Sequence, residues 1–120
     1  MAKKILFVDD SKSMRQVVGI ALKKAGYEVE TGEDGQDGVS KLDTRFHAII
    51  SDVNMPNMNG IEFIKAIKQN PTNKFTPIIM LTTESGADLK KQGQEAGAKV
   101  WMVKPFKPDQ LLMVLQKLLG

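Results

Sequence analysis

The sequence contains no cysteine, one histidine, one tryptophan and one tyrosine among its 120 residues. The lack of cysteine excludes a disulfide framework, a thiol nucleophile and a cysteine-based zinc site, and it allows a reducing compartment. The single histidine, His47, stands isolated before an apolar run, and we interpret it as structural or exposed rather than as a metal ligand. Without other histidines or cysteines, any metal site must use oxygen ligands.

The sequence also lacks the long apolar stretch that a membrane span requires, since no run approaches 18 residues. Residues 1–4 lead directly into an apolar run and do not resemble a signal peptide. A length of 120 residues is typical of one domain. We therefore expect one cytoplasmic domain spanning residues 1–120, without membrane insertion.

Charge of one sign is not in large excess, because 17 basic and 14 acidic side chains give a net charge of +3. This balance weakly favours an acidic partner. A nucleic-acid-binding surface would need a concentrated basic stripe with aromatic or groove-reading elements, and the sequence shows none. We expect no direct contact with nucleic acid.

Strand-like and helix-like segments alternate five times along the chain. Short apolar runs bounded by polar residues predict buried parallel strands, whereas residues 27–31 alternate in polarity and predict an edge strand. The strands are expected at 5–8, 27–31, 48–51, 78–81 and 100–103, and the helices at 12–25, 35–42, 60–69, 87–96 and from 108 onwards. This alternation predicts a doubly wound α/β fold, a parallel sheet with helices on both faces.

The predicted helix boundaries carry familiar signals. Ser11 or Ser13 is expected to cap the first helix, and Gly26 to end it. Asn59 is expected to cap the third helix, and Pro108 suits the first turn of the last one. Two glycines make the second helix the weakest of the five.

Polar side chains stand where four of the apolar runs end. Asp9 and Asp10 follow the first run, Asp52 follows the third, Thr82 closes the fourth and Lys104 follows the fifth. Ligands of open α/β sheets bind beyond the carboxyl ends of the strands, where these side chains would meet. Three crowded carboxylates repel one another unless a cation lies among them. Hard oxygen ligands favour Mg²⁺, and a nearby lysine and threonine favour phosphoryl chemistry.

Each of these residues also has an ordinary structural interpretation. Asp9 and Asp10 could be turn or capping residues, and Asp52 could cap a helix. Thr82 could be a plain strand-end hydroxyl, and Lys104 a solvated lysine. The functional interpretation depends on all of them occurring together, in register with the strand ends.

Four motifs together resemble the response-regulator receiver domain, and within it the single-domain chemotaxis regulators of the CheY type. They are Val8-Asp9-Asp10-Ser11, Ser51-Asp52-Val53-Asn54-Met55-Pro56 with Gly60, Leu81-Thr82-Thr83-Glu84, and Lys104-Pro105-Phe106. The resemblance covers the whole chain. It implies a flavodoxin-like (βα)5 fold with strand order 2-1-3-4-5 and a role in a two-component phosphorelay.

The resemblance implies a catalytic role for three residues. Asp52 would accept a phosphoryl group from a phosphohistidine of a chemotaxis-type sensor kinase, Lys104 would pair with the phosphoryl oxygens, and Thr82 would hydrogen-bond to them. Thr82 and Trp101 would form the switch. The bond between Lys104 and Pro105 resembles one that is cis in the family.

The resemblance also implies a Mg²⁺ site and a control of signal lifetime. Asp10 would bind Mg²⁺ directly, Asp9 directly or through water, Asp52 through its carboxylate and Asn54 through its backbone carbonyl. Asn54 and Glu84 stand at the positions that tune water attack on the aspartyl phosphate. The protein would thus promote its own phosphorylation and autodephosphorylation without being an enzyme in the usual sense.

Two residues depart from the chemotaxis pattern. Trp101 stands where those regulators commonly have tyrosine, and Val53 where the best known have tryptophan. These departures leave the flagellar motor, a second chemosensory system and another output all open as the target.

The last predicted helix suggests a partner surface. Its apolar stripe, which must face the sheet, consists of Leu111, Val114, Leu115 and Leu118. Two further leucines, Leu112 and Leu119, either pack against neighbouring loops or contribute to a target or dimer surface on the face of helix four, strand five and helix five. Lysines would frame that face: Lys90, Lys91, Lys99 and Lys107. We expect a monomer, with a phosphorylation-linked dimer as the alternative.

Three rival functions deserve comparison with a stand-alone phosphorylation switch. An aspartyl-phosphate hydrolase typically has Asp-x-Asp after a strand, whereas the first acids here are adjacent and the proposed nucleophile follows the third strand. A flavodoxin would need a Ser/Thr/Gly phosphate loop where Asp9 and Asp10 stand. A receiver that acts only as a binding module would not need the intact acidic site.

Overall fold

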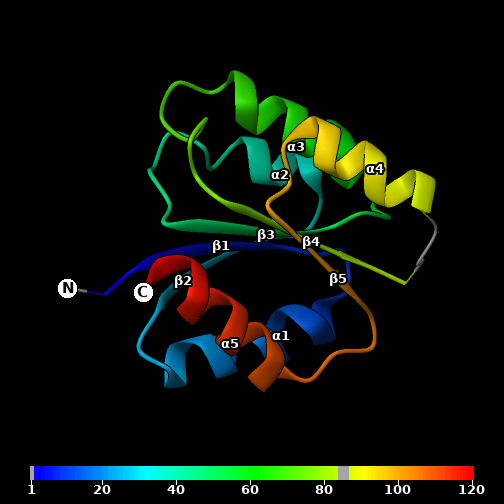
Figure 1. Ribbon diagram of the computed structural model, residues 1–120. Helices are drawn as coiled ribbons and strands as arrows, with labels where there is room; N and C mark the ends of the chain where they lie inside the picture. Colours follow the sequence, from blue (N-terminus) through cyan, green and yellow to red (C-terminus); the bar gives the residue numbers. More distant parts are fainter. Residues whose placement is uncertain (1, 84–86) are drawn as a thin grey trace.

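The computed structural model describes residues 2–83 and 87–120, in which strands and helices alternate along the chain (Figure 1). The strands are β1 (Lys4–Val8), β2 (Glu28–Gly32), β3 (Ala48–Asp52), β4 (Ile78–Thr82) and β5 (Val100–Val103). The helices are α1 (Lys12–Lys24), α2 (Gly35–Val39), α3 (Gly60–Gln69), α4 (Ala87–Ala96) and α5 (Pro108–Leu119).

All strand pairs are parallel, and the strands lie in the order β2-β1-β3-β4-β5. This confirms the predicted doubly wound, flavodoxin-like fold. Helices α2, α3 and α4 cover one face of the sheet, and α1 and α5 cover the other (Figure 1). Because the strands are parallel, their carboxyl ends meet at one edge of the sheet, which we call the carboxyl edge.

The core consists of two apolar layers separated by the sheet. Leu6, Ile49 and Phe63 belong to the layer under α2, α3 and α4, while Ile5 and Leu22 belong to the layer under α1 and α5. The side chains of β1, β3 and β4 are buried on both faces, apart from a half-exposed first residue in β1. This is why these strands read as continuous apolar runs and not as alternating ones.

Local signals set most helix boundaries as predicted. The Ser11 side chain accepts a hydrogen bond from the backbone N–H of Met14, so Ser11 caps α1. Asn59 caps α3 with a reciprocal pair of hydrogen bonds to Glu62. Gly26 follows α1 with a φ of +95°, a conformation that favours glycine.

Helix α2 is shorter than the sequence predicted, because it ends at Val39 and the chain continues through turns to Asp43. Two of its five residues are glycines, which lowers helix propensity. A Cβ atom at Gly38 would lie 2.6 Å from the ring of Phe63 on α3. The glycine therefore allows close packing of α2 on α3 at the expense of helix length.

Helix α5 packs against the sheet more broadly than one stripe. Leu111 and Leu115 are buried, and Leu112 and Leu119 also pack against the same core layer while remaining half-buried. These two leucines therefore pack on the core layer of the sheet, whereas the sequence led us to expect them on neighbouring loops or on a partner surface. Met113 points outward and is 58% exposed.

A buried asparagine holds the loop between α3 and β4. The Asn73 side chain accepts a hydrogen bond from the backbone N–H of Phe46 at 2.9 Å and donates to the carbonyls of Leu42 and Thr44. The Thr76 hydroxyl donates to the same side chain at 3.1 Å. These bonds fix residues 70–77 to the segment that precedes β3.

The two ends of the described chain lie side by side (Figure 1). The Lys3 ammonium donates hydrogen bonds to the carbonyl oxygens of Leu119 and Gly120, the latter at 3.2 Å. Both ends lie at the edge of the sheet where the strands begin. None of the described helices is long and apolar enough to cross a membrane.

Candidate functional site

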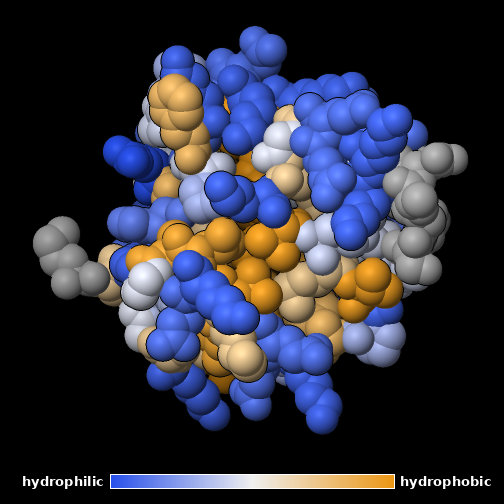
Figure 2. Space-filling view, viewed as in Figure 1, coloured by the Kyte–Doolittle hydropathy of each residue, from blue (hydrophilic) through white to orange (hydrophobic). Residues whose placement is uncertain are grey.

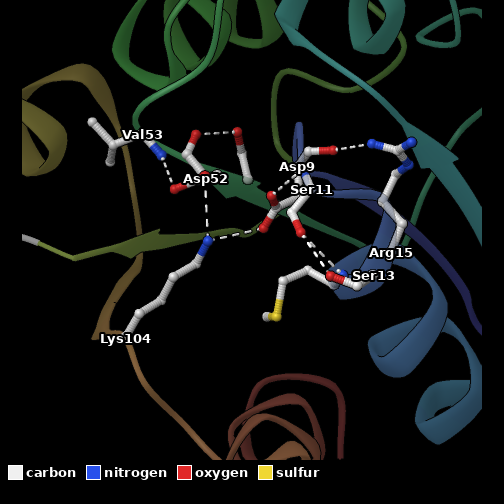
Figure 3. Close-up of polar contacts among 9 residues, drawn as sticks. Asp9, Ser11, Ser13, Arg15, Asp52, Val53 and Lys104 are labelled. Atoms are coloured by element: carbon white, nitrogen blue, oxygen red, sulfur yellow. Dashed lines mark hydrogen bonds and ion pairs between the residues drawn. The ribbon is translucent and has the colours of Figure 1, made fainter.

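Asp9 lies directly after β1, and its side chain is fully buried. One carboxylate oxygen accepts a hydrogen bond from the backbone N–H of Ser11 at 2.9 Å, and the other accepts one from the Lys104 ammonium at 3.0 Å (Figure 3). Its carbonyl oxygen accepts a hydrogen bond from the Arg15 guanidinium at 2.7 Å. The start of α1 thus holds this carboxylate in one orientation.

Asp52 is the last residue of β3 and only 6% exposed. Its Oδ1 accepts a hydrogen bond from the backbone N–H of Val53 at 2.9 Å, and its Oδ2 lies 3.3 Å from the Lys104 ammonium. Figure 3 shows the ammonium between the two carboxylates. Lys104 therefore bridges the carboxylates at the ends of β1 and β3.

Lys104 is anchored through its own backbone. Its N–H donates to the carbonyl oxygen of Thr82 at 2.6 Å, which continues the pairing of β4 with β5 beyond the last strand residues. The peptide bond from Lys104 to Pro105 is cis, as the resemblance implied. Thr82 is fully buried at the end of β4, so the structure brings Thr82, Lys104 and Asp52 to the same edge as predicted.

The electrostatics of the site favour accepting a cation or sharing a proton. Burial raises the pKa of the Asp52 carboxyl, the Lys104 charge opposes that rise, and the Asp9 charge adds to it. Burial would lower the pKa of Lys104, but its hydrogen bond to Asp9 and the Asp52 charge outweigh burial and raise that pKa. Lys104 therefore stays charged and compensates only part of the clustered negative charge.

The three aspartates form a possible metal site. One carboxylate oxygen from each of Asp9, Asp10 and Asp52 lies within 4.8 Å of the others, with Asp10 exposed and the other two buried. Hard carboxylate oxygens with an open, solvent-facing side fit Mg²⁺, which binds few protein ligands and retains water. The donor set therefore fits the predicted ion.

The structure places the remaining predicted residues around this cluster or outside the described part. Asn54 is exposed in the segment between β3 and α3. Trp101 lies on β5, half-buried, and its indole packs against Gly93 of α4, where a Cβ atom would lie 2.5 Å from the ring. Glu84 falls outside the described residues.

Three contributors were not anticipated from the sequence. Arg15 and Ser11 fix Asp9, and neither position carries a signal for that contact beyond its closeness in the chain. Gly60 was noted only as part of a motif. A Cβ atom there would lie 2.3 Å from the Asp52 carbonyl oxygen, so glycine is needed to pack the start of α3 against the end of β3.

Comparison with known proteins agrees with this geometry. The profile of the family described as "Response regulator receiver domain" matches residues 5–116. The chain belongs to this receiver family. The fold, the strand order and the acidic cluster at the carboxyl edge are those of a CheY-like receiver of two-component signalling.

Individual relatives refine the assignment within the family. The receiver is 39% identical over 120 residues to chemotaxis protein CheY1 of Helicobacter pylori, covering 98% of this chain and 97% of the relative. The chemotaxis response regulator CheY4 of Vibrio cholerae, known from a high-resolution structure, is 52% identical in sequence, with a TM-score of 0.94 over 99% of this chain and 100% of that one.

A third relative bears on the metal site. The receiver domain of a sensor histidine kinase from Pseudomonas aeruginosa is 28% identical, with a TM-score of 0.91, and covers 100% of this chain and 99% of its own. That structure has a magnesium ion coordinated in the active-site cleft. Receivers bind Mg²⁺ at an acidic pocket, and Asp9, Asp10 and Asp52 form an acidic cluster that could hold a metal ion.

Proposed function

We propose that residues 1–120 act as a chemotaxis-type response regulator that accepts a phosphoryl group on Asp52 and then changes its affinity for a partner. The observation that carries this proposal is the position of Lys104, whose ammonium lies 3.0 Å from Asp9 and 3.3 Å from Asp52. An ammonium held between two carboxylates at a sheet edge can move from these carboxylates to the oxygens of an incoming phosphoryl group and pair with their negative charge. The identity to CheY1 and CheY4 supports the chemotaxis assignment.

The proposed transfer is an in-line displacement. An Asp52 carboxylate oxygen attacks the phosphorus of a phosphohistidine on a sensor kinase, an O–P bond forms, and the P–N bond breaks with its electron pair left on the imidazole nitrogen. The Lys104 ammonium pairs with the phosphoryl oxygens, and the Thr82 hydroxyl donates to one of them. Thr82 ends β4, which pairs with β3, and Lys104 follows β5, so both residues lie at the same edge of the sheet as Asp52.

Asp9, Asp10 and Asp52, with the backbone carbonyl of Asn54, would hold Mg²⁺. When bound, the ion would neutralise part of the negative charge that the carboxylates and the phosphoryl group bring together. Asp9 is locked by Ser11 and Lys104, whereas Asp10 is exposed. Asp10 is therefore the ligand whose removal disturbs the rest of the protein least.

The proposed output face comprises α4, β5 and α5. Figure 2 shows hydrophobic residues gathered across the middle of this face, where Figure 1 places β5 between α4 and α5. Val103 and Met113 are 44% and 58% exposed there. The exposed lysines Lys90, Lys91, Lys99 and Lys107 suit an acidic partner segment around this apolar centre.

Affinity capture with an activated receiver tests the proposal. Beryllofluoride with Mg²⁺ imitates the phosphoryl group, and immobilised receiver is compared with and without it. Capture of the target should require both reagents and should be lost in Asp52→Asn and Lys104→Ala. Equal capture by unactivated receiver would favour a module that binds without phosphorylation.

The lifetime of the phosphorylated state depends on water access. Asn54 is polar and exposed beside Asp52, and Glu84 is polar in the sequence. We expect rapid autodephosphorylation, slowed when both residues are replaced by bulky apolar ones. Decay is measured by following phosphorylated protein on phosphate-affinity gels after removing the phosphodonor, and equal decay in variant and parent would place the control elsewhere.

A further inference from the structure

The charges of this receiver are divided between the two ends of its sheet. The edge where the strands begin, which we call the basic pole, is formed by segments 3–4, 23–28, 42–47, 68–77, 97–100 and 117–120. These segments contain nine Lys or Arg and two Asp or Glu residues, a side-chain charge of +7. The rest of the chain has eight basic and twelve acidic residues, a charge of −4.

Contacts between segments show that the basic pole is one continuous surface. The backbone N–H of Glu28 donates to the carbonyl oxygen of Lys3 at 2.9 Å, and the Lys3 ammonium donates to that of Gly120 at 3.2 Å. The Asn73 side chain accepts from the backbone N–H of Phe46 at 2.9 Å, and Gly97 packs against the Lys68 side chain. The backbone N–H of Lys4 donates to the His47 ring at 2.9 Å. Several of these lysines lie in last helical turns, where they also complement the helix dipole.

Phe75 protrudes from the basic pole. Among the large apolar side chains that the structure describes it is the most exposed, at 85%, and the Lys74 ammonium lies 5.1 Å from its ring centre. A single exposed apolar side chain is ordinary on a protein surface. Here, however, the buried hydrogen bonds of Asn73 hold the loop that displays the ring, and a cation, the Lys74 ammonium, lies beside it.

We propose that the basic pole is a docking surface for an anionic lipid membrane, with the Phe75 ring entering the headgroup region. The cations come from six segments spread over both helix layers and the edge of the sheet, so they do not line one groove. A planar, fluid anionic surface meets all of them at once. A protein partner would need acidic groups matched to each segment.

The charge division also sets the orientation of the bound receiver. The acidic remainder of the chain is repelled by anionic lipid, so the carboxyl edge with Asp52 faces away from the surface. Phosphorylation adds negative charge at that far edge and leaves the basic pole unchanged. Membrane contact is therefore independent of the proposed phosphorylation chemistry, and the two can fail separately.

Co-sedimentation of the full chain with vesicles tests this inference. We expect binding to vesicles of equal parts phosphatidylglycerol and phosphatidylcholine, and none to pure phosphatidylcholine. Raising salt from about 0.1 M to about 1 M shortens the Debye length from about 10 Å to about 3 Å and should release the protein. At matched ionic strength, the receiver should bind vesicles equally well with and without Mg²⁺ and beryllofluoride, and Phe75→Ser should weaken both equally.

Matched variants locate the contact. The triple variant Lys68→Gln, Lys74→Gln, Lys99→Gln should weaken binding about a hundredfold, since each lysine near the surface contributes about fivefold. Phe75→Ser should weaken it about fivefold, because it removes only the partly buried ring. The control with the same change in charge is the triple variant Lys12→Gln, Lys90→Gln, Lys107→Gln. These lysines lie towards the carboxyl edge, more than a Debye length from the lipid. The control should therefore retain vesicle binding within about threefold.

Three results would overturn the inference. The first is absence of binding to anionic vesicles, and the second is an equal loss of vesicle affinity in the two triple variants. The third is that the receiver binds soluble polyglutamate more tightly than vesicles and that Phe75→Ser does not change this affinity. The last result would assign the basic pole to an acidic protein. All variants change exposed or half-exposed side chains, so folding is checked by circular dichroism before the comparison.

Discussion

Replacing Gly60 with alanine should displace the phosphoacceptor without touching its side chain. The added Cβ atom would lie 2.3 Å from the Asp52 carbonyl oxygen and 2.8 Å from the Val53 Cα atom. An ordinary contact begins near 3.4 Å, so the start of α3 and the end of β3 must separate by about 1 Å. The Gly60 N–H also donates to the Val53 carbonyl oxygen at 2.8 Å, and this bond would lengthen.

Two magnitudes follow from this displacement. Overpacking of this kind costs about 1–3 kcal/mol in free energy of unfolding. Misplacing a reacting group by about 1 Å costs about a hundredfold in rate. We therefore expect Gly60→Ala to remain folded at 25 °C, to unfold at lower urea concentration, and to accept phosphate about a hundred times more slowly.

Gly19→Ala supplies the matched control. Gly19 lies in α1 on the opposite face of the sheet, and a Cβ atom there would have no heavy atom within 4 Å. Alanine should therefore add about 0.5–1 kcal/mol through helix propensity and leave phosphorylation unchanged. Urea unfolding gives the stabilities, and phosphate-affinity gels give the rates with a small phosphodonor and Mg²⁺.

The double variant separates displacement from unfolding. Because the two glycines are far apart, their effects on stability should add. The double variant should regain stability relative to Gly60→Ala and still react slowly. If it regains the parent rate, the loss came from unfolding. If Gly60→Ala alone is as stable and as reactive as the parent, the steric reasoning is wrong.

Further predictions concern metal, pH and the switch. At a Mg²⁺ concentration ten times its Kd, the parent should gain about 1.4 kcal/mol of stability, and Asp10→Ala should show no gain; an unchanged gain would refute the site. Burial raises the pKa of Asp52 in the folded state above 3.8. The unfolded state therefore ionises more easily, and the free energy of unfolding falls as pH rises through the folded-state pKa. Asp52→Asn should therefore stabilise the metal-free protein at pH 7, by about 1.4 kcal/mol for each unit of that rise, with the gain vanishing below pH 4; an equal gain in acid would contradict this cause. Mg²⁺ with beryllofluoride should change acrylamide quenching of Trp101, Thr82→Ala should blunt the change, and Gly93→Ala should raise quenching before activation by displacing the indole. Quenching that never responds would identify Trp101 as a fixed cover of the sheet edge.

The sequence predicted the order of elements well, for a physical reason. The strands β1, β3 and β4 are buried on both faces, and such strands must be apolar throughout. Capping residues such as Ser11 and Asn59 act within one turn, so their effect is visible in the local sequence. Helix α2 was less predictable because its end depends on packing between Gly38 and Phe63, which are distant in the chain.

The residues that meet at the site could be predicted from the sequence, but the contacts among their side chains could not. Strand ends that share an edge bring Asp9, Asp52, Thr82 and Lys104 together whatever the details of the loops. The ion pair between Lys104 and Asp9 joins residues 95 positions apart. Nothing in either segment says that Lys104 bridges both acids, because that depends on side-chain reach across two intervening strands.

The meeting of the two chain ends has a practical consequence for labelling and fusion. Lys3 contacts Gly120, so a tag or fluorescent domain joined at either end would emerge beside the basic pole, at the far end of the sheet from Asp52. Such a fusion would leave phosphorylation unobstructed while it shields the lysines and Phe75 from a large surface. A short linker joining these ends, with new ends opened elsewhere, would give a circular permutant that carries the label near the carboxyl edge instead. The choice of attachment point thus decides whether the basic pole or the carboxyl edge stays unobstructed in an imaging experiment.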